Sequence, residues 1–98
     1  MFTWDLTKAL ANLKKHGVSF KEALTTFEDP HGVELVDIKH STKELRLARF
    51  ALSSLGRVLT VIFTIRRQTN GTETIRIISA RPASRKERET YSRFRDRL

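Results

Sequence analysis

The sequence has 98 residues and a mass of 11.3 kDa, which is enough for one compact domain with a small hydrophobic core. It contains no cysteine, which excludes disulfide scaffolds, thiol catalysis and thiolate metal sites. The apolar runs are too short to cross a bilayer and no signal-type leader opens the chain, so we expect a cytoplasmic protein that does not act at a membrane.

The positive charge of the chain is large and unevenly distributed. Nineteen Lys and Arg residues against eleven Asp and Glu residues leave a formal net charge of +8. Most of the excess follows Gly56, and there every basic residue except Lys86 is an arginine. A guanidinium group can contact two phosphate oxygens at once, so this bias favours contact with nucleic acid over the alternative, a solvated surface that keeps the protein soluble.

The first part of the chain predicts two short helices. Asp5 can cap a helix over residues 6–16, and Gly17 can end it in the left-handed conformation. Ser19, with a glutamate three residues later, forms a capping box for a second helix that ends before Pro30. Apolar residues recur on one face of each helix, so we expect the two helices to lie on a sheet as a hairpin.

The middle of the chain predicts an antiparallel sheet. The strand candidates are residues 33–36, 45–52, 58–65 and 74–80. The third of these is almost wholly apolar, which is typical of a central strand, and Asn70-Gly71 marks a hairpin before the fourth. Connections this short predict an antiparallel meander of the last three strands. Residues 2–4 are either a short edge strand or an apolar plug.

A third helix is predicted from the capping box of Ser84 and Glu87 to the end of the chain. Tyr91, Phe94 and Leu98 form a narrow apolar stripe along it, which predicts that this helix docks on the sheet.

Arginines around the start of this helix are the candidate catalytic groups. Arg81 ends the last strand, and Arg85 lies in the first helical turn, where a cation opposes the helix dipole unless an anion is bound. We expect these guanidinium groups to gather at the carboxyl-terminal edge of the sheet and to hold the extra negative charge of a phosphodiester under attack. Arg66, at the end of the central strand, is a further catalytic candidate.

His40, in a polar stretch, is the candidate for proton transfer, because histidine changes its protonation near neutral pH; the alternative is an ordinary exposed histidine. Arg46 shares a strand face with Glu44, and the two residues predict an ion pair. The candidate substrate-binding residues are Arg46, Arg76, Arg88 and Tyr91.

Two of these substrate-binding candidates have a structural alternative. Arg76 is either a surface residue or part of the binding floor. The ring of Tyr91 fits the apolar stripe, although its hydroxyl could reach the site.

No metal or cofactor site is predicted. The three histidines are scattered without a carboxylate cluster, and the sequence has no glycine-rich phosphate loop. An arginine-based site without a metal suits RNA, because the 2′-hydroxyl is a built-in nucleophile. The protein then needs to orient it, to stabilise the dianion and to protonate the leaving 5′-oxygen.

Motifs along nearly the whole chain resemble those of the BrnT family, which are ribonuclease toxins of bacterial type II toxin–antitoxin systems. The matching segments are Trp4-Asp5, Asn12–Phe20 with Glu22-Ala23, the triplet His40, Glu44 and Arg46, Gly56–Leu59, Ile75–Arg81 and Ala83–Arg88 with Tyr91 after it. One departure is the connection over residues 66–73, which looks longer than in shorter members of the family.

The resemblance implies an α+β fold of the RelE-like kind, in which a small antiparallel sheet carries an N-terminal helical hairpin and a C-terminal helix in one domain, residues 1–98. It implies a metal-independent endoribonuclease that inhibits translation and growth. It also implies a cognate BrnA-like antitoxin with a ribbon-helix-helix part, through which alone the toxin would meet operator DNA.

Two other functions fit the same residues. A non-catalytic nucleic-acid-binding module, or a subunit of a DNA-binding regulatory complex, would account for the charge equally well. The basic half has few interleaved aromatic residues, which counts against that alternative. In the other alternative the basic face mainly docks an acidic protein, and an antitoxin could cover the same arginines.

Overall fold

The computed structural model describes residues 1–97; Leu98, the last residue of the predicted apolar stripe, lies outside the described residues. The elements in chain order are β1 (Phe2–Thr3), α1 (Leu6–His16), α2 (Phe20–Thr25), η1 (Thr26–Glu28), β2 (Val33–Val36), η2 (Ile38–His40), β3 (Arg46–Leu52), β4 (Val58–Arg67), β5 (Glu73–Pro82) and α3 (Arg85–Arg95). Over residues 1–97, no helix is both long enough and apolar enough to span a membrane.

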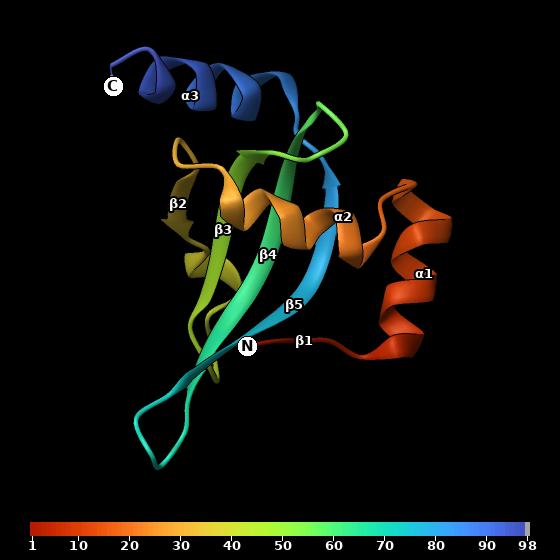
Figure 1. Ribbon diagram of the computed structural model, residues 1–98, viewed down its shortest axis with the longest axis vertical. Coiled ribbons are helices and arrows are strands. Elements are labelled where there is room, and N and C mark those ends of the chain that lie inside the picture. The colour runs from red at the N-terminus through yellow and green to blue at the C-terminus, as the bar shows by residue number, and fades with distance from the viewer. Residues whose placement is uncertain (98) are drawn as a thin grey trace.

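The strands form one mixed sheet in the order β1-β5-β4-β3-β2 (Figure 1). Strands β3, β4 and β5 form the predicted antiparallel meander, and β2 adds to it antiparallel. The expectation of a wholly antiparallel sheet is wrong at one edge, because β1 pairs parallel with β5, with Phe2 opposite Ile75. The direction follows from the next element: β1 leads into α1, which packs beside the later part of β5, so both strands run the same way.

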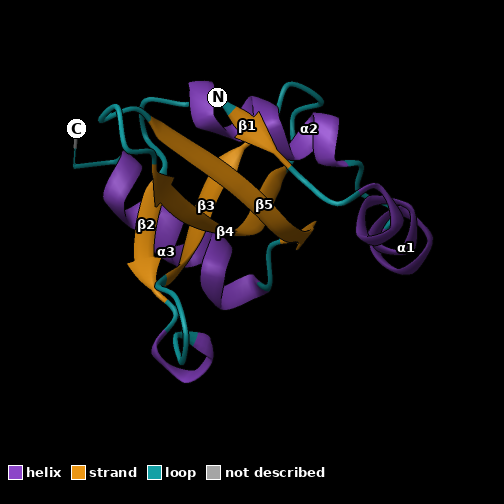
Figure 2. Ribbon diagram, turned by 90° about the horizontal axis from the view of Figure 1, so that it is seen from below, coloured by secondary structure: helices purple, strands orange, loops and turns teal. Residues whose placement is uncertain are grey.

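Helix α2 covers one face of the sheet, and the η2 turn lies on the opposite side (Figure 2). The main core forms on the α2 side. Its buried members are Val18, Phe20, Ala23, Leu59, Val61, Ile77 and Ala80. As predicted, β4 is a central strand, and its alternate residues from Leu59 to Phe63 are buried in or beside this core.

A β-bulge in β5 changes which of its side chains share a face. Ile62 pairs with Ser79 and Phe63 pairs with Ile77, so Ile78 has no partner in β4. Because strand side chains alternate, a regular strand would place Arg76 and Arg81 on opposite faces. The extra residue reverses the alternation between them, and the register puts both arginines on the face opposite the core.

The two N-terminal helices both contact β5, as expected for a hairpin on a sheet, but the apolar face of α1 is only partly covered. The buried residue of α1 is Asn12, which is 7% exposed. Its Nδ2 donates to the carbonyls of Val18 (2.9 Å) and Ala80 (2.8 Å), and its Oδ1 accepts from the Ala80 N–H at 3.1 Å. A single side chain thereby joins α1, the loop before α2 and the later part of β5.

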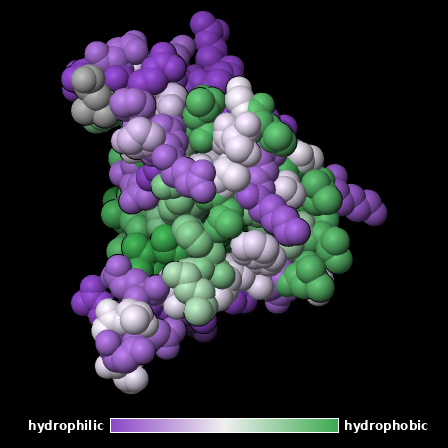
Figure 3. Space-filling view, viewed as in Figure 1, coloured by the Kyte–Doolittle hydropathy of each residue, from purple (hydrophilic) through white to green (hydrophobic). Residues whose placement is uncertain are grey.

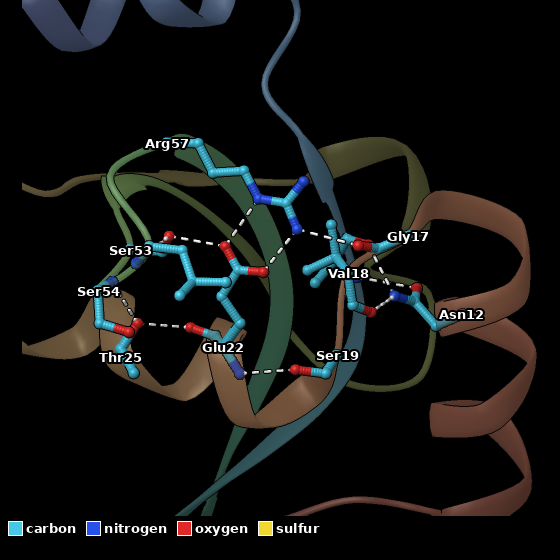
Figure 4. Close-up of polar contacts among 11 residues, drawn as sticks. Asn12, Gly17, Val18, Ser19, Glu22, Thr25, Ser53, Ser54 and Arg57 are labelled. Carbon is cyan, nitrogen blue, oxygen red and sulfur yellow. Dashed lines mark hydrogen bonds and ion pairs between the residues drawn. The ribbon is translucent and has the colours of Figure 1, made fainter.

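A buried carboxylate ties α2 to the β3–β4 turn (Figure 4). Arg57 donates to Glu22 through Nε at 2.8 Å and Nη2 at 2.6 Å, and Ser53 donates through its hydroxyl at 2.7 Å. The hydrogen bonds from Arg57 lower the pKa of Glu22 against the opposing effect of burial. The residue therefore remains ionised inside the fold.

Helix α3 begins as predicted, with Ser84 and Glu87 forming a capping box. It crosses one end of the sheet rather than its face (Figure 1) and contacts β2 and β3. Tyr91 is 2% exposed, and its hydroxyl donates to Asp29 Oδ2 at 2.6 Å. The apolar stripe therefore docks this helix through Tyr91, while Phe94 is 44% exposed.

The Asn12 contacts predict a large loss of stability on truncation. Asn12→Ala would leave a buried carbonyl and N–H of Ala80 without partners, and we expect it to lower the free energy of unfolding by about 2–4 kcal/mol. Urea denaturation followed by circular dichroism measures this change. Asn70→Ala, in an exposed turn, is the matched control, with an expected loss below about 1 kcal/mol. Equal losses in the two variants would contradict the role given to Asn12.

Candidate active site

A cleft lies on the face of the sheet opposite the core, between the strands and the η2 turn. Its floor comes from the central strands and its wall from the β2–β3 connection. The lining residues are Asp37, His40, Arg46, Ile62, Ser79 and Arg81, and an adjoining hollow shares His40 and Arg46 and adds Thr42, Lys43, Glu44 and Arg66. We call these two joined hollows the sheet cleft.

The cleft places an imidazole beside a carboxylate. His40 Nδ1 lies 3.0 Å from Asp37 Oδ2 and 3.1 Å from Oδ1, and the side chain of His40 is 64% exposed. A carboxylate in this position favours a proton on Nδ1, which leaves Nε2 as the nitrogen available to a substrate. His40 is predicted from the sequence as a site residue and Asp37 is not, although an aspartate three residues before a loop histidine is a signal that points to such a pair.

Register brings several arginines to this side of the sheet. Arg46 pairs with Thr64, and Thr64 pairs with Arg76, so the three side chains form a row across β3, β4 and β5. Among residues 1–97, neither Arg46 nor Arg76 forms an ion pair. Their charges are thus available to an anion on this face.

Arg66, another predicted residue of the cleft, has an acidic partner. Arg66 lies 3.6 Å from Glu44 Oε2, and both side chains are exposed, so this pair is weak. The predicted pair of Glu44 with Arg46 is wrong, because Glu44 approaches Arg66 instead. Strand β3 begins at Arg46, so Glu44 lies before the strand and the alternation of strand side chains does not fix its direction.

Arg81 forms a bidentate ion pair with Glu87. Its Nη1 and Nη2 donate to the two carboxylate oxygens at 2.6 and 2.8 Å. Glu87 also accepts from the Thr60 hydroxyl and the Ser84 N–H, each at 2.8 Å. Burial raises the pKa of this carboxyl, but these hydrogen bonds outweigh it and lower the pKa to about 2. Arg81 therefore lines the cleft in a fixed position with much of its charge balanced.

The structure separates Arg85 and Arg88 from the sheet cleft. They line a shallow depression beside α3, which we call the α3 depression, together with Leu52, Val58, Glu89, Tyr91, Ser92 and Arg95. Arg85 is 87% exposed and pairs with Glu89 one turn along, while Arg88 donates to the Ala83 carbonyl at 2.7 Å. The expected gathering of Arg81 and Arg85 in one pocket is therefore replaced by two separate basic surfaces.

Tyr91 belongs to the second surface, with its hydroxyl engaged inside the fold. Burial, then the hydrogen bond to Asp29, raises the pKa of Tyr91 to about 12. No group of three or more His, Asp or Glu side chains that could hold a metal occurs within residues 1–97.

A family model described as the ribonuclease toxin BrnT of type II toxin–antitoxin systems matches residues 4–87. The chain belongs to the BrnT family. The family resemblance inferred from the motifs is thereby confirmed. Every named arginine of the sheet cleft and the His40–Asp37 pair fall within the matched residues, whereas Arg88 and Tyr91 lie beyond them.

One solved structure supports the same assignment. The crystal structure of the Brucella abortus ribonuclease toxin BrnT is similar with a TM-score of 0.59 and 27% sequence identity, over 87% of this chain and 99% of that chain. A search among curated proteins returned no match. The predicted α+β class is confirmed, with a mixed five-stranded sheet in this BrnT-family chain.

The Glu87 contacts predict a pH-dependent stability. The carboxyl pKa is about 2 in the folded chain and returns to its ordinary value of 4.5 on unfolding. The stabilisation is therefore fully present above about pH 4.5 and is lost as the pH falls towards 2. We expect Glu87→Gln to lower the free energy of unfolding by about 2–3 kcal/mol at neutral pH, with the difference from wild type shrinking below pH 4.5.

Urea denaturation at a series of pH values measures this difference. Glu89→Gln, on the exposed side of the same helix, is the control and should change the stability little. A Glu87→Gln difference that stays constant down to pH 2 would show that the carboxylate pairing does not stabilise the fold.

Proposed function

We propose that this BrnT-family chain cleaves RNA in the sheet cleft, without a metal ion, as a toxin that inhibits translation and growth. The observation that carries the proposal is one juxtaposition: the Asp37–His40 pair lies in the same cleft as the guanidinium groups of Arg46 and Arg81. A proton-transfer group and fixed positive charges are two of the requirements for attack of a 2′-hydroxyl on its own phosphodiester.

In the proposed reaction, His40 Nε2 takes the proton of the 2′-hydroxyl as its oxygen bonds to phosphorus. The bond to the 5′-oxygen breaks, that oxygen takes a proton from water, and the imidazolium returns its proton to the hydroxide left behind. Asp37 is a positioning residue, because its contact with Nδ1 orients the imidazole. The products are a 2′,3′-cyclic phosphate and a 5′-hydroxyl end.

The phosphate is proposed to bind between Arg81, which is paired with a carboxylate, and Arg46, which is not paired with one among the described residues. Arg81 is held in place by Glu87 and offers a fixed dipole with little reorganisation. Arg46 forms no ion pair among the described residues, so it can turn its full charge to the dianion. Arg66 and Arg76 lie on the same side of the sheet and are proposed to contact neighbouring phosphates.

The proposal extends to the partners of the toxin. Membership in a type II family supports a protein antitoxin, and we assign it the BrnA-like, ribbon-helix-helix type, which alone would bring the complex to operator DNA. A RelE-like relationship of the fold is part of the same proposal. Arg85, Arg88 and Arg95 of the α3 depression are assigned to binding the RNA strand beyond the cleft.

The proposed chemistry predicts cleavage of RNA in excess EDTA. Purified protein should leave 2′,3′-cyclic phosphate and 5′-hydroxyl ends, which end-labelling and mass spectrometry identify. His40→Gln should lower the cleavage rate by about 10²- to 10⁴-fold, because the general base is lost. Because the side chain of His40 is exposed, we expect the thermal unfolding of this variant to match that of the wild type.

His16→Gln, at the end of α1, is the matched control and should cleave at the wild-type rate. RNA that is bound in a salt-dependent manner but stays intact at every pH would contradict catalysis and favour the non-catalytic binding module.

The proposed phosphate contacts predict a difference between two arginines. Arg46→Ala should lower kcat by about 10- to 100-fold, since a charged hydrogen bond to the dianion is lost. Arg67→Ala, on the exposed hairpin beside Glu73, is the control with the same charge change and should keep the wild-type kcat. Single-turnover kinetics measure the rate of the cleavage step in each variant separately from its affinity for RNA. Equal rates in the two variants would remove Arg46 from the site.

A further inference from the structure

An apolar groove lies between α1 and α2, on the helix-covered side of the sheet. Its apolar walls are Trp4, Leu6, Ala9, Leu10, Leu13 and Phe20, with Ser19 and Lys21 at its edge. The sheet cleft shares none of these residues. Phe20 belongs to the core, and Trp4 and Ala9 pack against it, whereas the leucines of α1 are left exposed beside them. RNA cleavage in the sheet cleft does not account for these leucines.

The leucines of α1 are exposed in spite of their amphipathic spacing. Leu6, Leu10 and Leu13 are 69%, 62% and 47% exposed, and their spacing of four and three places them on one helix face. Hydrophobic residues run along α1 at the right of the space-filling view (Figure 3). Single exposed leucines are ordinary, but a continuous apolar row beside a tryptophan is typical of a surface that binds a partner.

The charge around the groove selects the partner. Between Leu6 and Lys21 the chain carries four lysines and no aspartate or glutamate. Lys8 and Lys15 lie on the face of α1 opposite the leucines, whereas Lys14 lies beside the leucine row and Lys21 lies at the edge of the groove on α2. A second copy of this chain would bring its own lysines against these, since a symmetric contact uses the same patch twice. An acidic partner has no such repulsion.

We propose that the groove binds an amphipathic helix of a partner protein, with the apolar stripe of that helix against Leu6, Leu10 and Leu13 and its flanking carboxylates on Lys14 and Lys21. The groove is suited to one helix because its α1 wall presents anchors at helical spacing. We assign this helix to the antitoxin, and only this assignment rests on the proposed function. Docking here would leave the sheet cleft to other contacts.

A designed peptide tests the groove without knowledge of the natural partner. The probe is a tryptophan-free helical peptide of about 18 residues, with leucines along one face and glutamates on both flanks. Trp4 is the only tryptophan of the chain and lines the groove, so its fluorescence reports binding directly. We expect saturable binding with a Kd of order 1–100 µM.

Matched variants decide whether the groove is the binding place. Leu10→Asp should weaken peptide binding at least about tenfold, whereas Leu55→Asp, at a position 72% exposed in the β3–β4 turn, should not. Lys21→Glu should weaken binding more than Lys86→Glu, which makes the same charge change on α3. Thermal unfolding of each variant shows that the fold is retained.

Several outcomes would overturn the proposal. One is that the fluorescence of Trp4 does not change at millimolar peptide. Another is that a peptide with lysine in place of glutamate binds as tightly as the designed peptide. A third is that the wild-type protein sediments as a dimer and Leu10→Asp converts it to a monomer. Binding of anionic lipid vesicles in preference to the peptide would also overturn it. RNA cleavage is measured on the same samples. Leu10→Asp should keep it, so a groove that fails and a nuclease that fails are told apart.

Discussion

The carboxylate of Glu87 is the constraint on which the arrangement of the site depends. It accepts hydrogen bonds from β4 through Thr60, from β5 through Arg81 and from the start of α3 through Ser84. A carboxylate taken out of water is stable only when such donors surround it, so the three elements must meet at this point. The same contacts hold Arg81 at the edge of the sheet cleft, so helix capping and site geometry have one cause.

The sheet separates two surfaces of different chemistry. On the side of the η2 turn, strand register gathers arginines and a carboxylate-paired histidine over a polar floor. On the α2 side, the core fills the centre and leaves the leucines on the apolar face of α1 exposed. A phosphate-binding cleft must stay hydrated and basic, whereas a helix-binding groove must exclude water. Opposite sides of the sheet therefore leave room in one chain of this size for both the proposed phosphate-binding cleft and the proposed helix-binding groove.

Local signals account for what the sequence could predict. Capping residues, the left-handed Gly17 and the apolar run of β4 act within one element or its neighbour, and the helices and the meander were predicted from them. Features that depend on distant partners were not. The bulge at Ile78, the parallel β1 and the pairing of Arg81 with Glu87 are settled by contacts across the fold. Arg49 would be taken for a surface residue, yet it is 9% exposed and donates to Glu34 and to the Thr26 and Asp29 carbonyls.

The same distinction explains why a count of arginines does not locate the site. A guanidinium that already donates to a carboxylate contributes orientation, while one without an acidic partner contributes net attraction for a phosphate. In the sheet cleft Arg81 is of the first kind, and Arg46, which has no acidic partner among residues 1–97, is of the second. A diester needs both, because attraction brings the strand in and a fixed donor stabilises the charge that develops on its oxygens. The pairing of Arg81 with an acid is therefore compatible with its place in the site, provided that Arg46 supplies the uncompensated charge.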